Sequence, residues 1–71
     1  MPEIMRIRML AMIDTELKEV EGSISNNKVW ACAASTPEEE YMFEGNIMEL
    51  QEYQDFLLRL REQVVEDELE L

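Results

Sequence analysis

The sequence contains no histidine, one cysteine, two glycines and two prolines among its 71 residues. A single cysteine cannot form an internal disulfide, which excludes a small secreted scaffold held together by disulfides. Without histidine, a zinc or haem site would need unusual ligands, and the commonest general base of enzymes is missing. We therefore expect a protein that is not an enzyme and that binds no metal or cofactor.

Basic residues are also scarce. Six Lys and Arg stand against seventeen Asp and Glu, which gives a net charge of −11 and argues against direct binding of DNA, RNA or an anionic membrane. The longest apolar run, Met9–Ile13, is far shorter than the roughly 20 residues that span a bilayer. Arg6 and Arg8 precede no signal-peptide pattern, so we expect a cytoplasmic location.

The clearest structural signal is Thr36-Pro37-Glu38-Glu39. Thr at the N-cap, Pro at the first helical position and Glu two positions later are typical of a helix start. The sequence predicts one domain over residues 1–71, with helices at about 3–34 and 37–69. Because the connection is short, they form an antiparallel hairpin of class all-α. Poor helix formers at 22–27 could kink the first helix, and residues 28–32 could alternatively form a strand.

Apolar residues recur every three or four positions in both halves and so share one face of each helix. We expect them to form a coiled-coil-like seam. In the first helix the seam residues are Leu10, Ile13, Leu17, Val20, Ile24, Asn27 and Ala31; in the second they are Phe43, Asn46, Leu50, Tyr53, Leu57, Leu60 and Val64. Asn27 and Asn46 stand nearly level, where a polar pair can fix the register or contact a ligand.

The apolar surface is wider than one hairpin can bury. Ile47, Leu58, Val65 and Phe56 flank the seam in the second helix, and three methionines (Met5, Met9 and Met12) widen it in the first. An apolar arc of about 200° exceeds what a single neighbouring helix covers. We therefore expect a homo-oligomer, most simply a dimeric four-helix bundle.

Charge is concentrated in the second helix, since residues 1–37 carry −1 and residues 38–71 carry −10. This suggests an acidic interaction protein that binds or inhibits another macromolecule, with a charge resembling that of nucleic acid. A solvated helix face that keeps an oligomer soluble is the simpler explanation. The candidate partner-binding residues are Trp30, Tyr41, Met48, Glu44, Glu52, Asp55 and Glu62.

An alternative function uses the few cations. In a hairpin, Arg6 and Arg8 lie level with Arg59 and Arg61, and guanidinium groups bind phosphates well. Together with Asn27 and Asn46 they could hold an anionic small molecule such as a cyclic oligonucleotide. The chain would then be an oligomeric sponge, as some phage antagonists of bacterial immunity are. Neutralisation of nearby acids is the simpler role for these arginines, and a purely structural assembly module is a third possibility.

Overall fold

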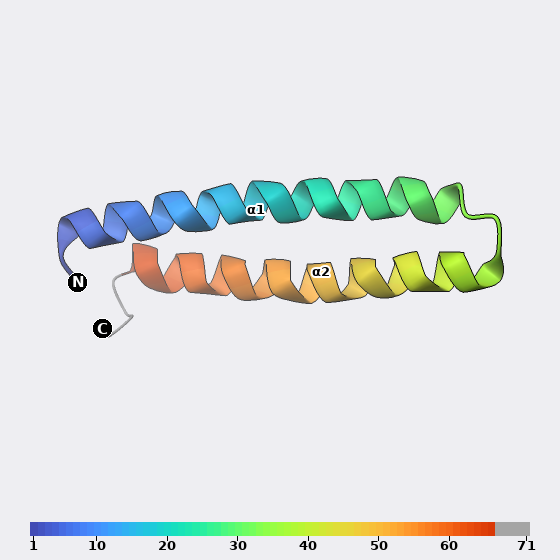
Figure 1. The fold of residues 1–71 in the computed structure, drawn as a ribbon. Coiled ribbons are helices and arrows are strands. Elements are labelled where there is room, and N and C mark those ends of the chain that lie inside the picture. Colours follow the sequence, from blue (N-terminus) through green and yellow to red (C-terminus); the bar gives the residue numbers. More distant parts are fainter. Residues whose placement is uncertain (67–71) are drawn as a thin grey trace.

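The protein is a hairpin of two long helices. The computed structural model describes residues 1–66, with α1 at Glu3–Cys32 and α2 at Pro37–Val65. The helices run antiparallel and side by side, with the turn at one end (Figure 1). The principal extents are 51 × 16 × 14 Å, so the molecule is a rod. The predicted all-α antiparallel hairpin is confirmed.

The start of α2 follows the predicted capping pattern. The Thr36 side chain accepts a hydrogen bond from the Glu39 backbone N–H at 3.2 Å, and Pro37 occupies the first turn. The Glu39 carboxylate reaches back to the Ser35 backbone N–H at 3.1 Å. The first bond satisfies a donor that a helix start leaves open, and the second ties the turn to the first turn of the helix. Residues 35–39 therefore fix where α2 begins after the turn.

Helix α1 is continuous through residues 22–27 and 28–32, so neither the kink nor the strand forms. Within this stretch the Asn27 side-chain amide donates to the Ser23 carbonyl oxygen at 2.8 Å, which gives the polar side chain a partner inside the helix. Buried Val20 and Ile24 pack on the same side. Tertiary packing therefore outweighs the low helix propensity here.

The helix ends differ slightly from the prediction. Helix α1 stops at Cys32, with Ala33 as its C-cap, instead of continuing to residue 34. Helix α2 stops at Val65, with Glu66 as its C-cap. The last part of the predicted second helix, residues 67–69, lies outside the described residues.

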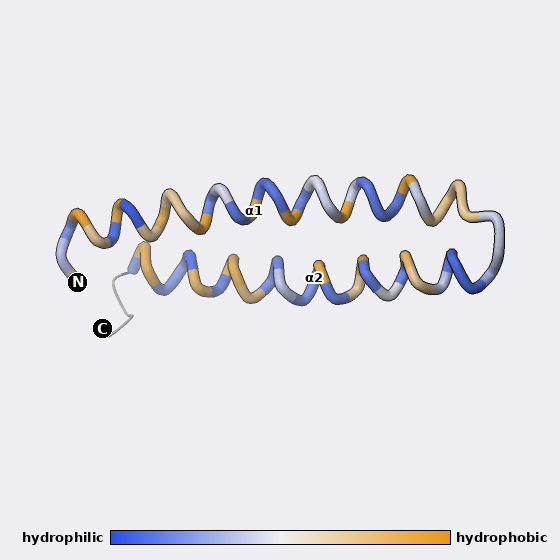
Figure 2. Tube along the Cα trace, in the orientation of Figure 1, coloured by the Kyte–Doolittle hydropathy of each residue, from blue (hydrophilic) through white to orange (hydrophobic). Residues whose placement is uncertain are grey.

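The core is a cluster of aliphatic side chains contributed by both helices. Hydrophobic positions recur along both helices in Figure 2. The buried members of the core are Ile13, Val20, Ile24, Leu57 and Val64. Half-buried neighbours such as Leu10, Leu17, Leu50 and Leu60 pack against them. All nine belong to the predicted seam.

The seam of α2 is centred differently from the prediction. Positions 43, 50, 57 and 64 carry only apolar residues and take the centre. Asn46 and Tyr53, predicted as seam residues, lie at one edge and are exposed, whereas Ile47 at the other edge is half-buried. A seven-residue repeat of large apolar side chains outcompetes a row that contains Asn and Tyr.

Contacts between the helices fix the register. The Arg61 guanidinium lies 2.7 Å from the Asp14 carboxylate, and Arg6 donates to the Val65 carbonyl oxygen at 3.2 Å. Halfway along, the Asn46 amide donates to the Asn27 side-chain oxygen at 3.2 Å. The predicted level pairing of the two asparagines is therefore present.

Candidate interaction surfaces

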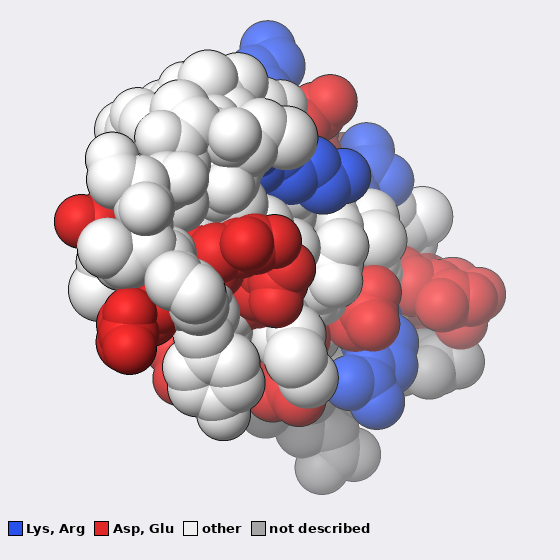
Figure 3. Space-filling view, turned by 90° about the vertical axis from the view of Figure 1, so that its right-hand side faces the viewer, with Lys and Arg blue, Asp and Glu red and all other residues white. Residues whose placement is uncertain are grey.

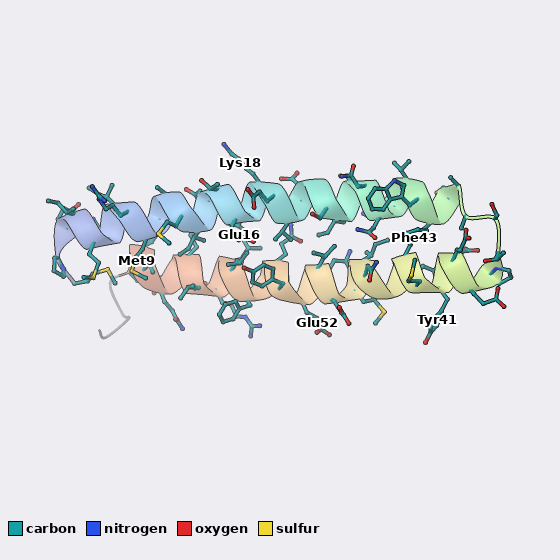
Figure 4. The ribbon with its side chains drawn as sticks, viewed as in Figure 1. Met9, Glu16, Lys18, Tyr41, Phe43 and Glu52 are labelled. Carbon is teal, nitrogen blue, oxygen red and sulfur yellow. The ribbon has the colours of Figure 1, made fainter. Side chains whose placement is uncertain are left out.

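The side of α2 that faces away from α1 is exposed along its length, and we call it the outer face of α2. Its residues recur every three or four positions: Tyr41, Glu44, Met48, Glu52, Asp55, Arg59 and Glu62. Figure 4 shows Tyr41 and Glu52 pointing away from α1. Tyr41 is 79% exposed, the largest value among the exposed large apolar side chains of the described chain. Six of the seven candidate partner-binding residues therefore share one surface.

This outer face is acidic with one base inside it. The Arg59 side chain donates to the Asp55 backbone carbonyl oxygen at 3.4 Å, so the guanidinium leans along its own helix. Seen from the turn end, acidic side chains gather over α2 while mainly uncharged atoms cover the end of α1 (Figure 3). Glu38, Glu39 and Glu40 lie at that end, in the first turn of α2.

Trp30, the seventh candidate, lies elsewhere. Its ring contacts Phe43 across the two helices, with centroids 5.9 Å apart and planes tilted by 49°. Tyr41 points outward from α2 instead. Trp30 and Tyr41 therefore do not share one patch, because their side chains leave the two helices in different directions.

A second surface runs along one long side of the hairpin, where both helices contribute exposed or half-exposed apolar side chains. We call it the aromatic face, and its members are Met5, Met9, Met12, Trp30, Met42, Tyr53 and Phe56. Heptad spacing places residues 9, 16, 23 and 30 along this edge of α1. An open hollow lined by Ser23, Asn46 and Glu49 shows that these edges of α1 and α2 adjoin.

Near the middle of the aromatic face, Tyr53 and Phe56 are stacked, with centroids 6.4 Å apart and an interplanar angle of 14°. Partial loss of hydration raises the pKa of Tyr53, and the charge and hydrogen bond of Glu16 raise it further. Glu16 lies between the helices in Figure 4. This carboxylate on the aromatic face therefore has a partner within the hairpin.

The opposite long side of the hairpin carries an ion pair as well as exposed apolar side chains such as Leu58 and Val65. The Asp14–Arg61 ion pair bridges the helices there, and the hydrogen bond and charge of Asp14 raise the pKa of Arg61 above its ordinary value. Both side chains remain more than 40% exposed. An ion pair this exposed adds little stability, but it distinguishes the two long sides.

The four arginines stand at the open end without converging. Arg6 pairs with Glu3 at 3.1 Å and Arg61 pairs with Asp14. Arg8 and Arg59 are exposed on the sides of their helices away from the seam. Arg6 and Arg61 therefore pair with Glu3 and Asp14. Of the acids near the end of the sequence, Asp67 and Glu68 lie outside the described residues.

The two asparagines are remote from these arginines, since Asn46 precedes Arg61 by about 22 Å along α2. Asn27 is only 7% exposed, and its amide and its carbonyl oxygen are both hydrogen-bonded within the hairpin. The pair therefore serves packing and register in this structure. The candidate ligand residues do not form one site in a single chain.

Within residues 1–66 there is no group of three or more acidic or cysteine side chains arranged to hold a metal ion. No helix in the described chain is long and apolar enough to cross a membrane. Comparisons with protein families, curated proteins and solved structures found no match.

Proposed function

We propose that the chain is a self-associating acidic interaction protein that binds a basic macromolecular partner, and that it acts by binding and not by catalysis. The observation that carries this proposal is the separation of two surfaces. The aromatic face gathers aromatic and methionine side chains from both helices, whereas the outer face of α2 is mainly acidic and uses one helix. Self-association through the aromatic face leaves the outer face of α2 accessible to a partner.

Self-association is supported by the amount of exposed apolar surface. Thirteen large hydrophobic side chains of the described chain are exposed, against five that are buried in the core. Isolated exposed apolar residues are ordinary, but contiguous patches on a chain this small mark an interaction surface. Chains of this length also gain much of their stability from oligomerisation when disulfides and metals are absent.

Binding to a basic partner is supported by charge density. A net charge of −11 along 51 Å is roughly one charge per 5 Å. Two chains side by side would double this density and approach the spacing of about 1.7 Å in duplex DNA. Tyr41 and Met48 add apolar anchors within the acidic outer face, and such anchors provide much of the binding energy in interfaces. This arrangement supports a function that mimics the charge of nucleic acid.

The alternative, an oligomeric sponge for an anionic nucleotide, has weaker support. Two of its four arginines already pair with carboxylates, and the other two lie on outer sides of different helices. An assembly of several chains would be needed to bring them together. We therefore place partner binding first.

The test compares two double variants of equal net charge. Glu52→Gln with Asp55→Asn neutralises the outer face of α2, and Glu19→Gln with Glu21→Gln neutralises exposed positions of α1. The probe is a fluorescently labelled oligoarginine peptide, and its affinity is measured by anisotropy at low salt. We expect about a tenfold loss for the α2 pair and about a twofold loss for the α1 pair, because nearby charges act most strongly.

Equal losses in the two variants would contradict a dedicated binding face, since net charge alone would then govern binding. A Tyr41→Ala variant tests the outer face of α2 without changing its charge. It should weaken binding while leaving the helical circular dichroism unchanged, because Tyr41 is an exposed side chain.

A further inference from the structure

We infer that a second copy of this chain covers the aromatic face and lies in the opposite orientation, with its turn beside the open end of the first copy. The inference rests on the proposed self-association and adds the face and the direction. Four helices would then enclose one apolar core. The contact is two-fold symmetric, so the same surface serves both chains.

A long side of the hairpin is large enough for a stable dimer interface. One long side of a rod that measures 51 Å by 16 Å offers about 800 Å². This matches the roughly 800 Å² that each partner buries in an interface of standard size.

The middle of this face is suited to contact with its own copy. Helix α1 runs from residue 3 to residue 32, so its midpoint lies close to Glu16 and its partner Tyr53. A two-fold axis there places the stacked Tyr53 and Phe56 rings of one chain opposite the same rings of the other. Aromatic groups packed at the centre of an interface contribute strongly to affinity.

Charge favours the opposite orientation. The turn end carries Glu38, Glu39 and Glu40, whereas four of the six basic residues of the chain lie toward the open end. Copies in the same orientation would place the two sets of three glutamates side by side. Copies in opposite orientations place the two sets at opposite ends of the dimer, which avoids this repulsion.

The opposite orientation also matches side chains along the edge of α1. Reversing the helix about its midpoint brings Trp30 of one copy level with Met5 of the other. Methionine sulfur makes favourable contacts with aromatic rings. Trp30 is half exposed in the hairpin, so it has surface available for such a contact.

The single cysteine allows a direct test in the full chain. Cys32 is exposed, stands at the turn end of α1 and carries no disulfide. A nitroxide spin label attached to it reports the distance between the two copies by pulsed electron paramagnetic resonance. Opposite orientations predict about 45 Å between labels, roughly the length of α1. Copies in the same orientation predict less than about 20 Å, close to the width of two adjacent hairpins.

Two matched variants test the face. Phe56 and Leu58 are exposed to similar extents, 53% and 49%, but only Phe56 belongs to the aromatic face. We expect Phe56→Ser to abolish the distance signal between spin labels on the two chains and Leu58→Ser to retain it. Circular dichroism checks that both variants keep their helices.

Each outcome decides one part of the inference. A long distance that disappears only in Phe56→Ser supports it. A short distance overturns the orientation but leaves self-association standing, and a long distance lost only in Leu58→Ser overturns the face. A mass of 8.4 kDa by sedimentation, with no distance between chains, overturns the inference and the self-association together.

Discussion

At the scale of single residues, neighbours in the sequence have opposite environments. Leu57 is 5% exposed in the core and Leu58 is 49% exposed. Leu57→Ala removes buried methyl groups and leaves a cavity, so we expect a loss of about 2–5 kcal/mol in the free energy of unfolding. Leu58→Ala should cost less than about 1 kcal/mol.

Urea denaturation followed by circular dichroism measures both changes at one protein concentration, because association affects the apparent stability. Similar losses in the two variants would mean that burial between α1 and α2 does not dominate the stability of the chain.

The contacts of individual residues were partly predictable from the sequence. The Thr36 cap and the level pair Asn27–Asn46 follow from local chemistry and from the geometry of a short hairpin, and both are present. The partners of Arg6 and Arg61 were missed, because Glu3 and Asp14 compete with several other carboxylates that sequence spacing alone does not rank. The contact between Trp30 and Phe43 was missed because the position of a residue along the hairpin does not fix the direction in which its side chain points.

At the scale of helices, α1 is long and continuous although Gly22 lies in its middle. A β-carbon built at Gly22 or at Gly45 meets nothing within 4 Å, and neither glycine has a left-handed backbone. Alanine at a helical position reduces the entropy of the unfolded chain without strain here. We expect Gly22→Ala and Gly45→Ala each to add about 0.5–1 kcal/mol to the free energy of unfolding.

Thermal and urea unfolding measure this gain. Ala11→Gly, at an exposed position of α1, is the reverse control and should lose a similar amount. Destabilisation by Gly22→Ala would indicate that the glycine is needed for a close approach, for example by another chain.

The periodic pattern predicted the helices and most of the seam, but it did not predict the exact centre of the α2 seam. The rows of residues 46–53–60 and 47–54–61 lie on either side of the central row 43–50–57–64. The periodicity of a single helix is compatible with either of them facing the other helix. Packing against α1 decides between them, and it leaves Tyr53 half exposed on the aromatic face. The sequence therefore identified most of the apolar residues but not how the exposed ones divide between two faces.

At the scale of the whole molecule, charge should act in opposite directions on the two proposed interactions. A chain of net charge −11 repels its own copy, so added salt should strengthen self-association. Binding of a basic partner should weaken over the same range, because screening removes the attraction.

Sedimentation equilibrium and peptide anisotropy from about 20 mM to about 500 mM sodium chloride measure the two trends. Self-association that weakens with salt would show that ion pairs between chains, and not apolar contacts, hold the copies together.

The elongated outline has a consequence for measurements of mass. A body three times longer than it is wide diffuses more slowly than a sphere of equal weight, so a single hairpin would elute from a sizing column at the volume of a heavier globular protein. Light scattering or sedimentation equilibrium, which report mass independently of shape, are therefore needed to determine how many chains associate.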